Sequence, residues 1–262
     1  MSLVPSQAAT TKPGPPATAG GYDGGHVDKL KFIGHQMEDP LRLEFNEWAR
    51  AGRGESMERG HRPVGEQAIE KMHVPDDARV IDIGCGSGWA SRLLAANAIN
   101  GRVVGIDISD EMIRVARAAS SDFANLEFQV ASAEELPFEN NEFTHAFSME
   151  SLYYYADMTR ALKEIHRVLA PGGWFVTVVD LYQENEPSHQ WIEKLNVPAQ
   201  LLSTAQYHSL FGRAGFVDIQ DERILDPAPI LDRYTGTSFR SHEDYLRYRA
   251  AGSLLVRGQA EK

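Results

Sequence analysis

Cysteine is almost absent from this chain of 262 residues, which contains Cys85 and no second one. One thiol cannot form an intramolecular disulfide or a cysteine-based metal cluster, so this composition is typical of a reducing cytoplasm. The sequence has no run of about 18 apolar residues, which argues against insertion into a membrane. Residues 1–25 lack a cationic segment followed by an apolar core, so no export signal is expected.

Basic residues are also in the minority. The chain has 26 Lys and Arg against 37 Asp and Glu, which gives a net charge of -11 with histidine neutral. This charge repels phosphate backbones, so nucleic acid is not an expected partner. The nine histidines show no H-x-x-x-H or similar ligand spacing, so no metal is expected.

The amino-terminal third divides into two expected segments. Residues 1–25 are rich in Pro, Gly, Ala and Thr, a composition that predicts a disordered tail. Residues 26–74 have a helical pattern, with Leu41, Phe45 and Trp48 on one face and a second helix expected from Pro63 to Met72. The polar, glycine-punctuated stretch between these two helices, residues 48–63, is predicted to be a loop.

From Arg79 onward, strand and helix patterns alternate along the chain. This alternation predicts an α/β fold, a Rossmann-like doubly wound sheet that is mostly parallel with helices on both faces. The carboxy-terminal part adds a helix over 203–214, a half-solvated strand over 216–224 and a last strand near 252–258. Residues 183–202 and 226–250 are expected to be insertions that cover a substrate pocket.

The stretch "VIDIGCGSG", residues 80–88, is the clearest local motif. Gly84, Gly86 and Gly88 stand where a strand gives way to a helix, the place at which open α/β sheets bind ligands. Glycine allows the backbone to turn tightly and to approach a ligand without an intervening Cβ. A nucleotide-like ligand is therefore expected at this turn.

An acid at the end of the next strand narrows the choice of ligand. Asp107 follows the glycine turn by about 20 residues, the spacing at which an acid reaches the hydroxyls of a ribose. The glycines are not spaced as in the dinucleotide fingerprint G-x-G-x-x-G, because Trp89 stands at the place of its third glycine. Asp82, just ahead of the turn, suits an ammonium group better than a pyrophosphate, which favours S-adenosylmethionine over NAD.

Four segments, "VIDIGCGSG", "VVGIDIS", "ASAEELPF" and "RVLAPGGWFVTV", occur in order at the usual spacing. With them the chain resembles the class I S-adenosylmethionine-dependent methyltransferases, especially the group that includes the ubiquinone and menaquinone C-methyltransferases. The resemblance covers about residues 75–182. It implies a seven-stranded sheet with an antiparallel last strand, a cofactor-binding methyltransferase domain over 75–262, and an amino-terminal helical lid over 26–74.

The resemblance also implies a set of cofactor contacts. Asp82, Gly84 and Gly86 would border the methionine part, and Gly88 completes the glycine turn. Asp107 would bind the ribose, whereas Ile108, Met112, Ser132, Ala133 and Glu134 would surround adenine, and Ser148 would end the strand under the sulfonium. Relatives commonly have aspartate where Ser132 stands, and a serine hydroxyl can accept the same hydrogen bond without a charge.

Catalytic candidates are harder to name, because methyl transfer from a sulfonium depends on holding the reactants in line and needs no particular side chain. Glu150, Tyr153 and His61 are the candidates, as a base, a pocket wall and a lid residue that reaches the substrate. Each has a competing interpretation: a capping carboxylate, a packed ring and a surface histidine. Tyr153, Tyr154 and Tyr155 are consecutive, so they cannot all face the pocket.

The expected function is methyl transfer from S-adenosylmethionine to a small-molecule acceptor, in a cytoplasmic protein that could form a homodimer. S-adenosylhomocysteine would be the product. Three alternatives remain open: the same fold acting on a protein or an RNA, an NAD-dependent oxidoreductase, and a cofactor-binding regulatory protein without turnover. Neither the acceptor nor the methylated atom can be read from the sequence.

Overall fold

A mixed β-sheet forms the centre of the computed structural model, which describes residues 39–262. Its seven strands lie in the order β3-β2-β1-β4-β5-β7-β6, with β7 antiparallel to both of its neighbours. The expected Rossmann-like sheet with an antiparallel last strand is therefore confirmed. The strands are β1 (Arg79–Ile83), β2 (Arg102–Asp107), β3 (Leu126–Val130), β4 (Phe143–Met149), β5 (Leu169–Val179), β6 (Phe216–Ile224) and β7 (Ser253–Ala260).

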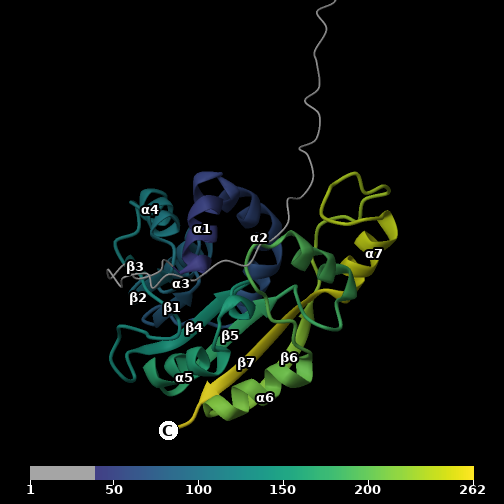
Figure 1. Ribbon diagram of the computed structural model, residues 1–262. Helices are drawn as coiled ribbons and strands as arrows, with labels where there is room; N and C mark the ends of the chain where they lie inside the picture. Colours follow the sequence, from purple (N-terminus) through teal and green to yellow (C-terminus); the bar gives the residue numbers. More distant parts are fainter. Residues whose placement is uncertain (1–38) are drawn as a thin grey trace, which may run out of the picture. The chain divides into compact units, whose positions relative to one another are not determined.

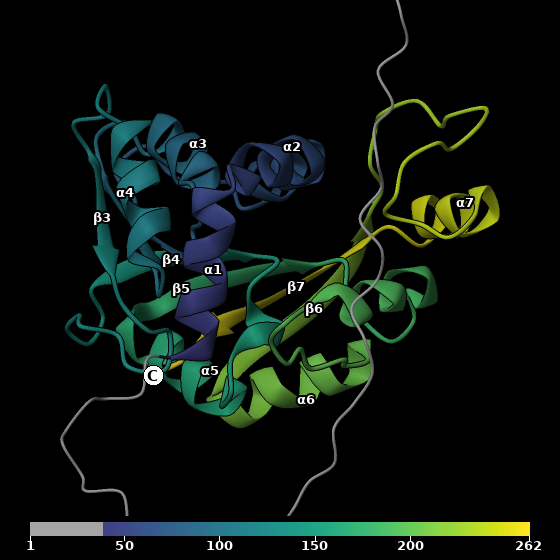
Figure 2. The same ribbon diagram turned by 45° about the horizontal axis from the view of Figure 1, so that its top comes forward.

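Helices cover both faces of this sheet (Figures 1 and 2). On one face lie α2 (Arg53–Lys71), α3 (Trp89–Asn97) and α4 (Asp110–Ala118), and on the other α5 (Met158–Val168) and α6 (Thr204–Ala214). Helix α1 (Pro40–Arg50) packs on α4, and α7 (His242–Ala251) packs on η2, a 3-10 helix over Glu186–Lys194. A short 3-10 helix, η1 (Leu152–Tyr154), follows β4.

The central strands are buried because helices cover them on both sides. Val80, Ile81 and Ile83 of β1 are fully buried, as are the apolar residues of β2 beside them. Such continuous apolar runs are typical of parallel strands in the middle of a sheet. In β6, at one edge, half-buried and exposed residues alternate except at Gln220 and Asp221, which are both exposed, so the strand is half-solvated as the sequence pattern predicted.

The amino-terminal part differs from the sequence-based expectation. Residues 53–62, predicted as part of a loop, instead form the first half of α2, and Pro63 lies inside that helix. Ion pairs one helical turn apart, Arg62 with Glu58 and with Glu66, stabilise this exposed segment. The prediction was wrong because Gly54 and Gly60 were interpreted as loop residues and Pro63 as the first residue of the second helix, although tertiary packing of α2 on α3 compensates for these residues inside a helix.

The helix predicted over 203–214 is confirmed as α6. Ser203 caps this helix in a capping box with Gln206, and Ser109 caps α4 by accepting from the Met112 amide at 3.0 Å. The predicted tail over 1–25 and the start of the predicted 26–74 segment lie outside the described residues. Among residues 39–262, no helix combines the length and apolar character needed to cross a membrane.

Candidate cofactor and acceptor site

The chain turns sharply where β1 ends, and this turn forms the floor of a deep cavity. The amides of Gly84 and Cys85 both donate to the Ile106 carbonyl at 2.9 Å, which ties the turn to β2. Gly84 and Gly86 have φ angles of 72° and 53°, in the left-handed region that favours glycine. A Cβ on Gly86 would meet no atom within 4 Å, so its bare backbone borders open space.

Asp107, at the end of β2, is fixed beside this turn. Its Oδ2 accepts from the Gly86 amide at 2.9 Å and its Oδ1 from the Ser109 amide at 2.8 Å. The side chain is largely buried, and this burial raises the pKa of Asp107 to about 6 despite the two hydrogen bonds, which lower it. The acid expected to bind a ribose thus lies within hydrogen-bonding reach of the glycine turn.

The cavity contains about 1330 Å³ of empty space, part of which opens to solvent. Most of the expected cofactor residues line it, so the fold brings together positions from four separate sequence segments. They are Gly84, Gly86, Asp107, Ile108, Met112, Ser132, Ala133 and Glu134. Asp82, Gly88 and Ser148 are not part of the lining.

These three residues lie behind the cavity wall. Asp82 is buried below the turn, where its Oδ2 accepts from the Ser91 hydroxyl at 2.5 Å. Burial raises the pKa of Asp82 to about 7, and the nearby Asp107 carboxylate adds to this effect. Gly88 serves packing, because a Cβ there would lie 2.7 Å from the ring of Phe128. Asp82 therefore affects the cavity through its charge and not through contact.

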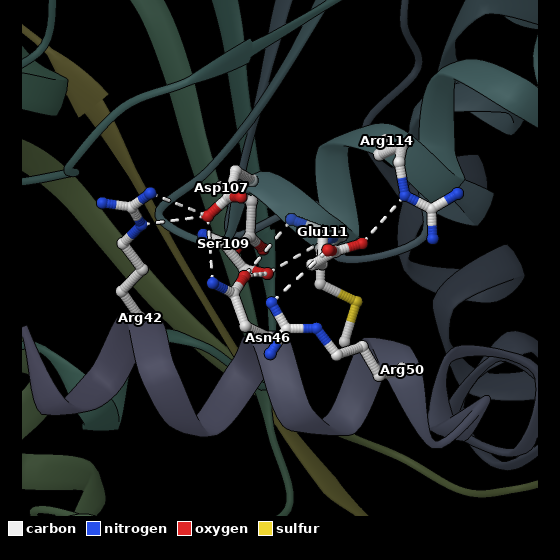
Figure 3. Close-up of polar contacts among 9 residues, drawn as sticks. Arg42, Asn46, Arg50, Asp107, Ser109, Glu111 and Arg114 are labelled. Atoms are coloured by element: carbon white, nitrogen blue, oxygen red, sulfur yellow. Dashed lines mark hydrogen bonds and ion pairs between the residues drawn. The ribbon is translucent and has the colours of Figure 1, made fainter.

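Helix α1 closes one side of the cavity and is fastened to the start of α4 by polar contacts (Figure 3). Asn46 donates to Asp110 Oδ1 at 3.0 Å, and its own Oδ1 accepts from the Ser109 hydroxyl at 2.6 Å. Arg42 forms an ion pair with Asp110 at 2.9 Å. Leu41 and Phe45 of the same helix line the cavity, so this contact holds α1 against the cavity; its role as a lid stays a prediction.

The other end of the cavity is mainly apolar. Met57 of α2, Met149 at the end of β4, and Val197 and Pro198 in the segment before α6 line it. The ring of Phe45 meets that of Tyr154 edge to face, with 5.1 Å between the ring centroids. Val197, Pro198 and Gln200 thus contribute to the wall, and the role of the whole stretch 183–202 as a cover stays a prediction. The other expected cover, 226–250, contributes no residue to the lining.

Glu150 is the acidic group at this apolar end. It lines the cavity with a strained φ of 55°, and its carboxylate accepts from the Tyr153 hydroxyl at 2.8 Å and from the Asp180 amide at 2.5 Å. Burial raises the pKa of Glu150 well above its ordinary value. Tyr153 does not line the cavity; its buried ring positions Glu150 from behind, whereas Tyr154 and Tyr155 face the cavity.

His61 of α2 comes close to Glu150, although the two residues are far apart in the chain. A ring nitrogen of His61 and carboxylate oxygens of Glu150 and Asp180 all lie within 4.8 Å of one another. Two of the three catalytic candidates are therefore neighbours. Sequence reasoning missed Asp180, whose place at the end of "FVTVVD", where β5 reaches the ligand-binding edge of the sheet, was the one available signal.

The fold and this site together define the class. A sheet of order β3-β2-β1-β4-β5-β7-β6, a glycine turn after β1 and an acid ending β2 are the Rossmann-like arrangement that was expected for methyltransferases. Residues 81–177 match the family described as a methyltransferase domain. That match covers the glycine turn, Asp107 at the end of β2 and Glu150 after β4, and it ends inside β5.

Comparisons with known proteins agree. The demethylmenaquinone methyltransferase of Staphylococcus saprophyticus is 32% identical over 117 residues, 44% of this chain and 50% of that protein. The chain thus spans about half the length of this curated relative. A chain in the solved complex of the Haloferax volcanii Trm112 methyltransferase activator with a methyltransferase is 36% identical, with a TM-score of 0.79 over 84% of this chain and 98% of that one.

A third solved structure is similar in fold. Phosphoethanolamine N-methyltransferase 2 of Haemonchus contortus, in complex with S-adenosylhomocysteine, is 21% identical with a TM-score of 0.59, over 76% of this chain and 52% of that one. The chain belongs to the class I S-adenosylmethionine-dependent methyltransferases, within the group that includes the menaquinone and ubiquinone methyltransferases. Its family cofactor is S-adenosylmethionine.

Proposed function

We propose that this protein is an enzyme that transfers the methyl group of S-adenosylmethionine to a small-molecule acceptor bound at the apolar end of the cavity. The observation that carries the proposal is the continuity of one cavity from Asp107 and the glycine turn to Met57, Met149 and Glu150. Both substrates of a methyl transfer can therefore lie in one enclosed space. The lid formed by α1 and the wall at 197–200 favour a small acceptor over a macromolecule.

The residues along the cavity fit S-adenosylmethionine. Asp107 offers a carboxylate to the ribose hydroxyls, and the open backbone at Gly86 leaves room for the methionine part. Ile108 and Met112 provide apolar contacts for a planar base, next to the polar groups of Ser132 and Glu134. The buried charge of Asp82 and Asp107 suits a ligand that carries an ammonium and a sulfonium and no phosphate.

When bound, S-adenosylmethionine supplies an electrophilic methyl group on a positively charged sulfur. The chain then has to orient the acceptor and keep water out, which are large contributions to the rate of an in-line displacement. We assign this orientation to Tyr154 and Phe45, whose rings line the apolar end, and to Glu150, the acidic group there. Tyr153 is a positioning residue that holds the Glu150 carboxylate.

Calorimetric titration of the purified protein with S-adenosylmethionine and, separately, with NAD tests the cofactor assignment. We expect micromolar binding of the former and none of the latter. Binding of NAD alone would overturn the assignment of the glycine turn. If neither ligand binds, although cooperative unfolding shows that the protein is folded, a role without methyl transfer would be favoured.

An assay with a pool of small-molecule metabolites tests the acceptor class. Its readout is the formation of S-adenosylhomocysteine. The 36% identical relative was solved with the Trm112 activator, so the assay is run with and without a partner of that type. We expect turnover with metabolites and not with protein or RNA fractions. Turnover with a macromolecular fraction alone would contradict the proposed acceptor class.

A further inference from the structure

Three side chains from three different elements converge beside the apolar end of the cavity. His61 lies on α2, Glu150 directly follows β4 and Asp180 directly follows β5, and one ligand atom from each lies within 4.8 Å of the other two. These three residues are called the His61 cluster below. Glu150 and Asp180 are buried, with 8% and 4% of their surface exposed.

The charges of the His61 cluster are not balanced by basic side chains. Among residues 39–262, no Lys or Arg forms an ion pair with Glu150 or Asp180. Neutral groups hold the two carboxylates instead: Tyr153 and the Asp180 amide for Glu150, and the hydroxyls of Tyr248 and Ser253 for Asp180. Two buried carboxylates without a positive partner are costly, and a bound cation would offset that cost.

The imidazole of His61 faces these acids without touching them. Within the described part of the chain it forms neither a hydrogen bond nor an ion pair with Glu150 or Asp180, although the ligand atoms lie within 4.8 Å. Two neighbouring ligands of one tetrahedral metal ion, with bonds of about 2.1 Å, lie about 3.4 Å apart. The His61 imidazole is therefore too far from the acids for direct contact, and a small movement of its side chain would bring all three ligand atoms around one ion.

A second observation points to a ligand at the same place. The hydroxyl of Tyr207, on α6, is fully buried and has no hydrogen-bond partner among residues 39–262. Burial raises the pKa of Tyr207, and the nearby Glu150 carboxylate raises it further. Buried hydroxyls of this kind normally have a partner, and a water molecule bound to an ion in the His61 cluster would provide one.

We propose that His61, Glu150 and Asp180 bind one divalent cation of the Mn²⁺, Fe²⁺ or Zn²⁺ type at the acceptor end of the cavity. One imidazole and two carboxylates suit these borderline cations better than Ca²⁺ or Cu⁺. Because Glu150 lines the cavity, the ion would be reachable from it and could contact an oxygen or nitrogen of the acceptor. Neither the family description nor the relatives above names a metal.

The test uses the full chain, treated with a chelator and then titrated with MnCl₂ while the signal of free Mn²⁺ is followed by electron paramagnetic resonance. Zn²⁺ is titrated in parallel by competition with a chromogenic chelator. We expect about one tight site per chain. His61→Ala and Asp180→Asn should each weaken binding of the preferred ion at least tenfold, whereas His145→Ala, on β4 and outside the cluster, should leave binding unchanged.

The result is separable from the proposed function. Calorimetry with S-adenosylmethionine shows that each variant is folded, because the cluster shares no residue with the glycine turn or Asp107. If neither ion binds, or if His61→Ala and His61→Gln bind as tightly as the parent chain, the proposal is wrong. The two carboxylates would then be neutralised by protons, and the cofactor assignment would be unaffected.

Discussion

The Gly86 amide donates a hydrogen bond of 2.9 Å to the Asp107 carboxylate, which joins the glycine turn after β1 to the end of β2. This bond places a carboxylate next to backbone that has no side chain, at the floor of the cavity. The second Asp107 oxygen is held by the Ser109 amide at the start of α4. Three elements therefore have to be in place to form the proposed ribose position, and cofactor binding should depend sharply on Asp107.

Replacing Asp107 with Asn should weaken the binding of S-adenosylmethionine at least tenfold, by about 1.4 kcal/mol or more. The amide keeps the size of the carboxylate, but it loses the charge, and its NH₂ group would face a backbone N–H that now has no acceptor. Calorimetric titration measures the change. Asp122→Asn is the control, because Asp122 is exposed and lies outside the cavity lining. Equal affinity in the Asp107 variant and the parent would refute the ribose assignment.

A side chain at Gly86 should block the cofactor without a clash inside the protein. Gly86→Val adds atoms to a position where a Cβ meets nothing within 4 Å, so the new side chain extends into the cavity. Gly52→Val is a close control: Gly52 also has a left-handed φ, of 70°, and no neighbour within 4 Å, but it lies outside the cavity lining. Both should lose similar stability in thermal unfolding, and only the Gly86 variant should lose binding.

The residues proposed to bind the cofactor could be predicted because they occur in short, contiguous sequence motifs. Gly84, Gly86 and Asp107 occur at strand ends, and the fold of a parallel sheet brings such ends together. The amino-terminal helices were harder, because Gly54, Gly60 and Pro63 resemble a loop until the packing of α2 is known. Local propensity is a weak guide where tertiary contacts decide.

Long-range polar contacts could not be predicted at all. Asp180 meets His61 through the juxtaposition of β5 and α2, and Asn46 meets Ser109 through the docking of α1 on α4. The residues of each pair are far apart in the chain, and no sequence motif or periodicity links them. Asp82 is a case in which the sequence predicted a contact that the structure does not show. Its motif suggested contact with the ligand, whereas the fold buries Asp82 against Ser91.

Binding of S-adenosylmethionine should release protons near neutral pH. Burial raises the pKa of Asp82 to about 7 and that of Asp107 to about 6, and a positively charged ligand favours the ionised form of both. Affinity should therefore fall as the pH drops from 8 to 5.5, by up to about tenfold per pH unit for each coupled proton. Calorimetry at pH 6.5 in buffers of different ionisation enthalpy counts the protons, and identical heats in all buffers would contradict this linkage.

The same two groups should affect the stability of the free protein with the opposite sign. Their folded-state pKa values are higher than the ordinary aspartate value, so between about pH 4 and 7 the unfolded chain binds fewer protons than the folded one. Their contribution to the free energy of unfolding should decrease as pH rises through this range. Asp82→Asn should flatten that part of the stability profile measured by urea unfolding, and an unchanged profile would show that Asp82 is not the group responsible.

The packing of α1 on α4 should depend on Asn46 far more than on the ion pair between Arg50 and Glu111. Asn46 is buried, with 5% of its surface exposed, and bonds to Ser109, Asp110 and the Glu111 amide. Asn46→Ala leaves the Ser109 hydroxyl and the Glu111 amide without their acceptor, whereas Asp110 keeps Arg42, and it should cost about 1 to 3 kcal/mol in urea unfolding.

Arg50→Ala is the matched variant on the same helix. It removes an exposed contact of 3.4 Å with Glu111 and should cost less than about 0.5 kcal/mol. Because α1 also supplies Leu41 and Phe45 to the cavity wall, only the Asn46 variant should release S-adenosylmethionine faster in a stopped-flow displacement experiment. Equal release rates in the two variants would mean that α1 covers the cavity without holding the cofactor in place, and the lid would then have to be sought in residues 197–200.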